Sequence, residues 1–185
     1  MKRCGWVKQN DATYEAYHDE EWGKPLHNER ALFELFSLET QAAGLSWLTV
    51  LKKREGYRDA FSDFVLEKVA RLGSSDVERI LKEGAVIKSR PKIEAIIHNA
   101  RIFETIAKEF GSLGAYFWGY VEGKTIVNDI KDYKMGPCTS SISDAMSKDL
   151  KKRGIKFIGS TTLYAFMQAC GMVNDHENDC WCKTH

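Results

Sequence analysis

Apolar side chains recur at three- and four-residue steps along most of this chain, and this helical periodicity is the feature that most constrains its fold. The steps predict helices at residues 30–43, 47–55, 66–71, 75–83, 91–110, 144–152 and 161–171, with glycine-containing breaks between several of them. Runs of β-branched residues, which favour strands, are scarce. The sequence therefore predicts an all-α fold, with one irregular stretch at roughly residues 121–143.

The charge balance and the cysteines limit the kinds of protein that this chain can be. It carries 27 Lys and Arg against 26 Asp and Glu, so any surface that binds nucleic acid must be a local one. No apolar segment has the length of a signal peptide or a membrane span, so we expect a cytoplasmic protein with no membrane partner. In that reducing compartment the five cysteines favour thiols or metal ligands over disulfides.

One carboxylate lies on the face of a predicted helix that should be buried. Glu39 follows Phe36 by three residues and Leu35 by four, on the same apolar stripe as Leu32 and Ala43. Burial of an unpaired charge is costly, so Glu39 is expected to have a partner, a shifted pKa or a ligand.

A helix, a short connection and a second helix are predicted at residues 75–110. Asp76 or Ser75 suits the cap of the first helix, and Gly84 suits a left-handed exit from it. Pro91 suits the first turn of the second helix. The pattern is that of a helix-hairpin-helix, although an ordinary helix pair has the same signals.

Two groups of residues are candidates for contacts with nucleic-acid phosphates. Backbone N–H groups of the connection, together with Lys88 and Arg90, are suited to bind a phosphate without reading base sequence. The basic stretch 148–156 ends with Lys156 and leads into Ser160 at the start of a helix, which makes it a second candidate. A solvated helix face is the alternative for this stretch.

Histidine and cysteine, residue types that zinc prefers, occur near both ends of the chain. His176 and Cys180 are four residues apart and could bind one ion from one helical turn. Cys4 and His18 share only the first segment, so a free thiol and a hydrogen-bonded histidine are the alternative for this pair.

A nucleobase deaminase is a second candidate from the same residue types. The string HDE at residues 18–20 matches the first half of the deaminase zinc signature, and Pro137 with Cys138 begins the second half. The string TSS follows, so the second cysteine of that signature is missing and the site lacks one metal ligand.

Six long blocks of the sequence follow one another in an order that points to one known family. They are RCGWV, YEAYHDEEWG, LETQAAGLSWLTVLKKRE, RPKIEAIIHNA, KRGIKFIGSTT and FMQACGMVNDH. These blocks span nearly the whole chain, which closely resembles the 3-methyladenine DNA glycosylase I family of bacterial base-excision repair enzymes. The resemblance implies a helix-hairpin-helix DNA glycosylase in which zinc joins the N- and C-terminal segments.

The resemblance also implies how the chain is organised. Residues 1–185 would form a single glycosylase unit, with a helical region at about 25–120 that contains the helix-hairpin-helix at 75–110. Residues 1–24 and 121–185 would form the terminal region that zinc clips together.

By position, the resemblance implies that one zinc ion is held by Cys4, His18, His176 and Cys180. Four protein ligands leave no open position for an activated water, so this zinc would stabilise the fold and would not perform the chemistry. The other three cysteines lie outside this ligand set.

A pocket for a flipped-out base around Glu39 is a further implication of the resemblance. Its walls would be Trp6, Tyr17, Trp22 and Trp47, which stack on the base while Glu39 accepts a hydrogen bond from its exocyclic amine. Taken singly, each aromatic residue is also explained as a packing residue. Leu45, on the turn after the Glu39 helix, is a candidate wedge for the gap left in the DNA, with a core position as its alternative.

The activity that the resemblance implies is hydrolysis of the N-glycosidic bond of 3-methyladenine in alkylated double-stranded DNA, with free 3-methyladenine as product. Methylation at N3 leaves the base positively charged in DNA, so aromatic faces and a carboxylate favour it over neutral adenine. Glu39 is the expected catalytic residue, no general base is assigned, and no lysine has an evident reason to form a Schiff base. We expect a monomeric, monofunctional enzyme; the alternative is a zinc-stabilised helix-hairpin-helix module that binds DNA without catalysis.

Overall fold

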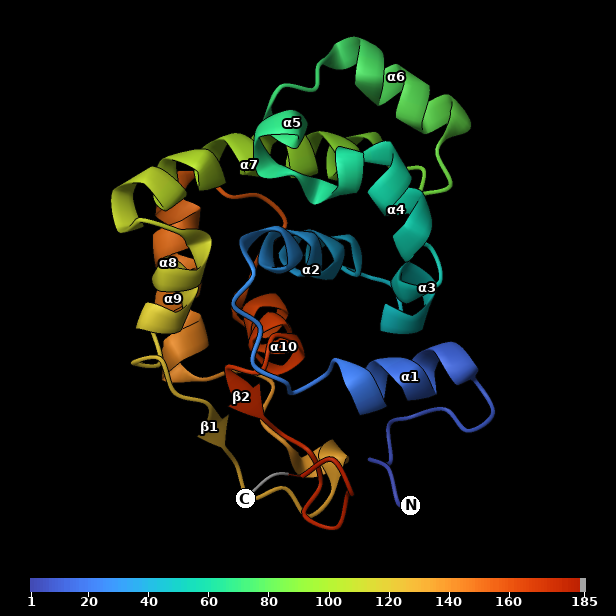
Figure 1. Cartoon of the computed structure of the whole chain (residues 1–185), viewed down its shortest axis with the longest axis vertical. Helices are drawn as coiled ribbons and strands as arrows, with labels where there is room; N and C mark the ends of the chain where they lie inside the picture. The colour runs from blue at the N-terminus through green and yellow to red at the C-terminus, as the bar shows by residue number, and fades with distance from the viewer. Residues whose placement is uncertain (184–185) are drawn as a thin grey trace.

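The computed structural model describes residues 1–183, which form ten α-helices, two short 3₁₀ helices and one pair of two-residue strands (Figure 1). The helices are α1 (Ala12–Glu20), α2 (Glu29–Gln41), α3 (Trp47–Leu51), α4 (Arg54–Ala60), α5 (Leu66–Ala70), α6 (Ser74–Glu83), α7 (Arg90–Phe110), α8 (Leu113–Gly119), α9 (Ser141–Arg153) and α10 (Ser160–Ala169). The short elements are η1 (Ser62–Phe64), η2 (Tyr133–Met135), β1 (Ile126–Val127) and β2 (Val173–Asn174). The all-α prediction is confirmed. Among the described helices, none has the combination of length and apolar character that a membrane crossing requires.

Helix α2 lies at the centre of the molecule, between α7 on one side and α10 on the other (Figure 1). Every residue of 32–41 is buried. A helix buried on all sides must have its polar groups satisfied or shifted in pKa. Glu34 is satisfied by ion pairs with Arg54 and Arg58, at 2.5 and 2.8 Å. Glu39 lies on the same helix and turns toward the functional site.

Helices α6 and α7, with the connection between them, form the predicted helix-hairpin-helix. The N-cap of α6 is Gly73, whose N–H donates to the Asp76 carboxylate at 3.0 Å. Gly84 leaves α6 in an extended conformation (φ −63°, ψ 141°), so the predicted left-handed exit is wrong. The C-terminal carbonyls of α6 are satisfied by a side chain instead, because the Lys88 ammonium donates to the Ile80 carbonyl at 3.0 Å and to the Gly84 carbonyl.

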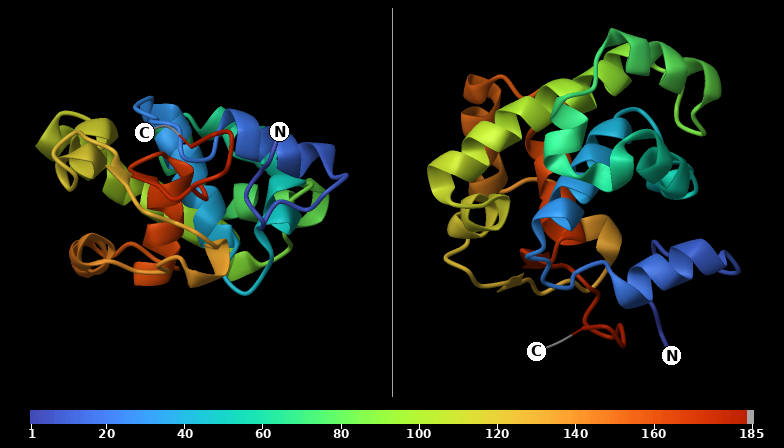
Figure 2. Two further views of the ribbon diagram at one scale, coloured as in Figure 1. Left: turned by 90° about the horizontal axis from the view of Figure 1, so that it is seen from below. Right: turned by 45° about the horizontal axis from the view of Figure 1, so that its top comes forward.

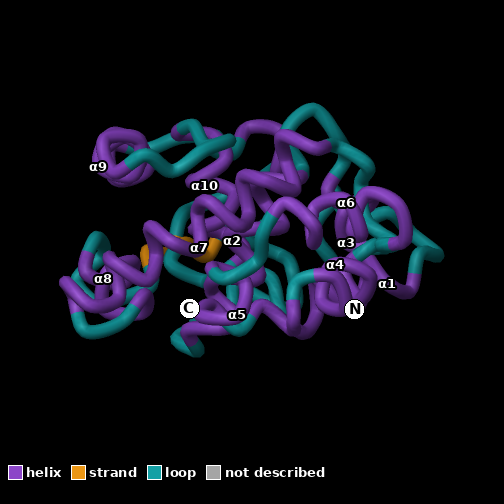
Figure 3. Tube along the Cα trace, turned by 90° about the horizontal axis from the view of Figure 1, so that it is seen from above, coloured by secondary structure: helices purple, strands orange, loops and turns teal. Residues whose placement is uncertain are grey.

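Most predicted helices are present (Figure 3), with their ends shifted by at most three residues. Pro91 lies in the first turn of α7 as predicted. The single helix predicted at 47–55 is wrong, because the chain turns after Leu51 and begins α4 at Arg54. This turn lets both short helices direct apolar residues into the core. The periodicity does not predict α1 or α8.

The first residues of the chain and the last described ones, up to residue 183, lie at the same end of the molecule (Figures 1 and 2). The Trp181 N–H donates to the Lys2 carbonyl at 3.0 Å, and the Lys2 side chain pairs with Asp179. Parallel pairing of β1 with β2 joins the irregular 121–143 stretch to the C-terminal segment. These contacts bring residues that are distant in the sequence to one site.

Candidate active site and metal centre

A pocket with a volume of about 340 Å³ lies between the central helix α2 and the terminal segments. Helices α1, α2, α3 and α10 and the segments around them form its walls. The lining residues are Trp6, Tyr14, Tyr17, Trp22, Glu39, Trp47, Ile130, Tyr133, Gly136, Pro137, Cys138, Thr161, Tyr164, Ala165, Gln168 and Asp175. The volume is in the range of small-molecule sites. All five residues that were predicted to surround a base line this one pocket.

Glu39, on helix α2, lines this pocket. The residue is 9% exposed, and its carboxyl makes no hydrogen bond or ion pair with the described part of the chain. Burial raises the pKa of Glu39 to about 8, so the carboxyl is mostly protonated at neutral pH in the free protein. A carboxyl on a pocket wall that has no protein partner is available to form a hydrogen bond or an ion pair with a ligand.

Aromatic rings form the apolar walls of the pocket. The ring centroid of Trp6 lies 5.0 Å from that of Trp22 and 5.1 Å from that of Tyr14. The rings of Tyr17 and Trp47 are 5.4 Å apart. The indole N–H groups of Trp6 and Trp47 are buried, and neither has an acceptor among the described residues. Apolar faces with spare donors suit a planar ring that carries hydrogen-bond acceptors.

A second carboxylate, which the sequence analysis does not identify, lines the pocket from the segment after β2. Asp175 accepts hydrogen bonds from the Tyr164 hydroxyl at 2.9 Å and from the Gln168 amide at 2.8 Å. Asn128 donates a third hydrogen bond to it at 2.7 Å. These three donors fix the Asp175 carboxylate in place, whereas the Glu39 carboxyl has no such donors among the described residues. The signal for it in the sequence is its position directly before His176.

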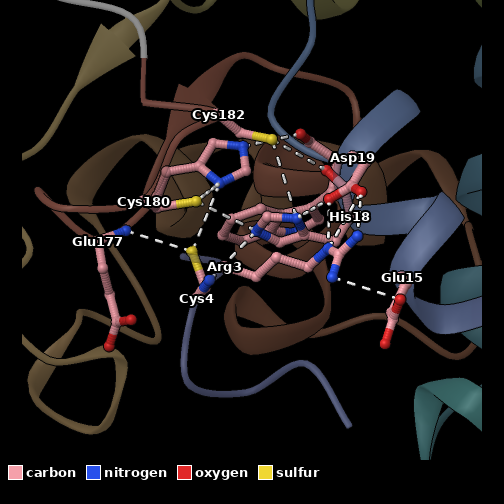
Figure 4. Close-up of polar contacts among 10 residues, drawn as sticks. Arg3, Cys4, Glu15, His18, Asp19, Glu177, Cys180 and Cys182 are labelled. Carbon is pink, nitrogen blue, oxygen red and sulfur yellow. Dashed lines mark hydrogen bonds and ion pairs between the residues drawn. The ribbon is translucent and has the colours of Figure 1, made fainter. Parts of the chain in front are cut away.

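Two thiols and two imidazoles from opposite ends of the chain form a buried cluster. Its members are Cys4, His18, His176 and Cys180, and their ligand atoms all lie within 4.8 Å of one another. The Cys4 Sγ lies 3.4 Å from His176 Nδ1. The Cys180 Sγ lies 3.4 Å from His18 Nε2 and 3.6 Å from His176 Nδ1. Figure 4 shows the sulfur atoms of Cys4 and Cys180 close to the His18 ring. The cluster could hold a metal ion.

Hydrogen bonds outside the cluster orient both imidazole rings. His18 Nδ1 lies 2.8 Å from Asp19, which in turn accepts three hydrogen bonds from Arg3 at 2.8 to 3.0 Å (Figure 4). His176 Nε2 lies 3.1 Å from the Trp22 carbonyl, so its Nδ1 faces the thiols. Burial lowers the pKa of both histidines, that of His176 to about 4, which favours the neutral rings that metal binding needs.

Two further cysteines lie near these sites without joining the four-residue cluster. The Cys182 Sγ is 3.9 Å from His18 Nδ1 and forms a separate group with His18 and Asp19. Cys138 lies in the pocket wall and belongs to neither cluster found among the described residues. The ligand set of a deaminase is therefore not assembled around Cys138.

Three of the residues predicted to contact DNA lie on a turn, a loop and a helix start. Leu45 is 43% exposed on the turn between α2 and α3, which excludes its alternative as a core residue. Lys156 is exposed, and its backbone N–H donates to Asn99 of α7 at 2.9 Å. Ser160 begins α10, and its hydroxyl lies 2.7 Å from that of Ser143, so this group already has a partner.

The other two predicted DNA contacts, Lys88 and Arg90, lie at the end of the hairpin. Both are exposed, but both also have partners within the chain. The Lys88 ammonium is held by the C-terminal carbonyls of α6. Arg90 pairs with Glu78 at 2.6 Å and with Glu94 at 3.6 Å. A phosphate would have to compete with or join these partners.

Comparison with known proteins identifies the family of this chain. A family model described as methyladenine glycosylase matches residues 6–183. The chain belongs to the methyladenine glycosylase family. A curated relative in this family, DNA-3-methyladenine glycosylase of Haemophilus influenzae, is 47% identical over 182 residues, which are 98% of this chain and 98% of the relative.

Solved structures of the family have the fold described above. A crystal structure of 3-methyladenine DNA glycosylase I has a TM-score of 0.95 at 46% identity and covers 99% of this chain and 100% of its own. A structure that addresses 3-methyladenine recognition by the Staphylococcus aureus enzyme has a TM-score of 0.95 at 38% identity, covering 100% and 98%. The resemblance found in the sequence and the fold that it implied are confirmed.

Proposed function

We propose that this methyladenine glycosylase family member hydrolyses the N-glycosidic bond of 3-methyladenine in alkylated double-stranded DNA. Its relatives are named for that activity, and one solved structure concerns recognition of the same base. The observation that carries the proposal is Glu39, a buried carboxyl with a raised pKa in an aromatic pocket.

Recognition of the damaged base follows from charge. A base methylated at N3 is cationic in DNA, and a cation beside Glu39 lowers the pKa of this carboxyl. Ionised Glu39 then attracts the base and accepts a hydrogen bond from its exocyclic amine. Trp6, Tyr17, Trp22 and Trp47 would add stacking and cation–π attraction, on the order of 0.5 to 2 kcal/mol. Neutral adenine lacks this electrostatic gain.

The reaction breaks the bond between the sugar C1′ and N9 of the base. The cationic base leaves with the bonding electron pair as neutral 3-methyladenine, while water adds to C1′ and releases a proton to solvent. We assign Glu39 as the catalytic residue because it would stabilise positive charge at the base, and we assign no general base. Burial lowers the pKa of Lys92, but two carbonyl oxygens hold its ammonium, so we assign no Schiff-base lysine.

Zinc is the metal that we propose for the cluster. Tetrahedral zinc, with Zn–S of about 2.3 Å and Zn–N of about 2.0 Å, would place sulfur and nitrogen about 3.5 Å apart. Separations of 3.4 to 3.6 Å between these atoms support this choice. Cys4, His18, His176 and Cys180 would fill its coordination, so the zinc would join the terminal region (1–24 and 121–185) and stabilise the fold of one unit.

Contacts with the duplex complete the proposal. Leu45, as the exposed apolar tip of a turn beside the pocket, would fill the gap left by the flipped base. Lys88, Arg90, Lys156 and Ser160 would contact phosphates and so bind DNA of any sequence. We propose that the enzyme acts as a monomer in the cytoplasm.

The test is to incubate the protein with methylated duplex DNA and to analyse the released small molecules by mass spectrometry. We expect free 3-methyladenine and an equal number of abasic sites, and neither with heat-denatured protein. DNA binding without a released base would support the non-catalytic module instead. Ammonia would indicate a deaminase.

A further inference from the structure

The turn that carries Leu45 is held by a side chain of the helix-hairpin-helix, and we propose that Lys92 positions this turn for base extrusion. Lys92 lies on the first turn of α7, and its ammonium donates to the carbonyls of Gln41 and Ala43 at 2.8 and 2.7 Å. Gln41 is the last residue of α2 and Ala43 follows its C-cap, so the ammonium lies at the C-terminal end of the helix, where a cation is favoured by the helix dipole. The inference rests on the proposed function, in which Leu45 enters the DNA.

The side chain of Gln41, on α2, forms further hydrogen bonds between α2 and the helix-hairpin-helix. Its side-chain amide donates to the Lys92 carbonyl at 3.2 Å and accepts from the Tyr57 hydroxyl at 3.2 Å. The same hydroxyl accepts from the Ile87 N–H at 3.3 Å, within the hairpin connection. We call Gln41, Tyr57, Ile87 and Lys92 the hairpin latch. Gln41 and Tyr57 are fully buried, so water does not compete for their hydrogen bonds.

The turn itself is open to solvent, so its position depends on what holds its ends. Residues 43–46 are all exposed, and Gly44 has a φ of +77°, a conformation that side chains other than glycine rarely adopt. Within the turn, the Leu45 N–H donates to the Ala42 carbonyl at 2.8 Å. The latch therefore fixes the distance between Leu45 and the hairpin that is proposed to bind phosphates. A phosphate contact and a wedge can act together only at a fixed spacing, because errors of about 1 Å in positioning cost on the order of a hundredfold in rate.

The variant Lys92→Met tests this role because it keeps an unbranched side chain, one atom shorter than lysine, and removes the donor. We expect the single-turnover rate of 3-methyladenine excision from duplex DNA to fall about tenfold or more. The Kd for free 3-methyladenine should stay within about twofold, because none of these hydrogen bonds involves a residue that lines the pocket. Lys92→Arg keeps a cationic donor and should restore most of the rate. Lys108→Met, which removes the same charge from the exposed last turn of α7, is the matched control and should excise at the wild-type rate.

Two results would overturn the inference. One is a wild-type excision rate in Lys92→Met; the other is an equal loss of free-base binding, because the side chain would then hold the pocket and not the turn. Thermal unfolding of each variant shows that it is folded, and Lys92→Gln replaces Lys92→Met if the latter is not. A wild-type protein that releases no 3-methyladenine would reject the proposed function, which is a different outcome from either of these.

Discussion

The Nε2 atom of His176 lies 3.1 Å from the carbonyl oxygen of Trp22, so one imidazole of the cysteine–histidine cluster is hydrogen-bonded to the pocket wall. Their rings are also in contact, with centroids 4.7 Å apart. In the chain, His18 directly follows Tyr17, and His176 directly follows Asp175; both preceding residues line the pocket. The cluster therefore supports the pocket as well as the junction between the two ends of the chain.

Removal of the metal is expected to weaken base binding and to lower the stability of the fold. Protein purified without chelator should contain one zinc per chain. Chelation should lower the unfolding temperature and change tryptophan fluorescence, because Trp22 loses its support. A lost stacking wall worth about 1.4 kcal/mol would raise the Kd for free 3-methyladenine about tenfold. Absence of metal by elemental analysis would remove the zinc assignment.

Two cysteines near the C-terminus provide a matched pair for the cluster. Cys180→Ala should lose the metal and unfold at a lower temperature, because structural zinc contributes folding free energy. Cys182→Ala should keep both, because its sulfur faces Nδ1 of His18 while the cluster uses Nε2. A stable Cys180→Ala protein that lacks only catalysis would contradict a structural role for the metal.

Lys88 and Arg90 are predicted to bind phosphates in spite of their partners within the chain. Changing both to Gln should weaken binding to DNA of any sequence and reduce the slope of log Kd against log salt by about 1 for each lost contact. Glu78→Gln removes the partner that lies 2.6 Å from Arg90, so it should strengthen binding. If the double variant keeps the wild-type slope, the contact lies elsewhere, with the basic stretch 148–156 as the next candidate.

Local periodicity predicts the helices with a regular apolar stripe and misses α1 and α8. Helices α2, α6 and α7 are predicted to within one or two residues, because each presents an apolar stripe. Helix α1 is missed because, of the residues that it buries, Tyr17 lines the pocket and His18 belongs to the cysteine–histidine cluster. These faces carry no apolar repeat.

The residues of the candidate site also differ in whether the sequence alone identifies them. Glu39 is recognised from the sequence because its anomaly, a carboxylate on an apolar stripe, is local. Asp175 is not, because its donors lie on α10 and directly after β1, and only the tertiary fold brings these two parts of the chain together. The partners of Lys88 are missed for the same reason, since an exposed lysine and one that caps a helix have the same sequence signal.

The stability of the free protein should depend on pH through Glu39. Burial raises the pKa of Glu39 in the folded protein to about 8, above the ordinary value of 4.5. Between these values the folded protein binds more protons than the unfolded chain, so stability is complete below the lower value and is lost as the pH rises through the upper one. Relative to Glu39→Gln, the wild type should lose on the order of 4 kcal/mol of unfolding free energy between about pH 5 and about pH 9. Urea unfolding measures this difference, and an equal pH dependence in the two proteins would contradict it.

Glu39→Gln should also separate recognition from folding. The two side chains have nearly the same shape, and loss of an expensive buried carboxyl can stabilise the free protein, so the variant should fold. Its amide oxygen can still accept one hydrogen bond but no longer attracts a cationic base. Loss of such a contact typically costs about 1.5 to 3 kcal/mol, or roughly ten- to hundredfold in excision of 3-methyladenine. Glu67→Gln, which changes an exposed carboxylate on α5, is the control and should excise at the wild-type rate. Full activity of Glu39→Gln together with reduced stability would identify Glu39 as a structural carboxyl, and the assignment of the pocket that depends on it would fail.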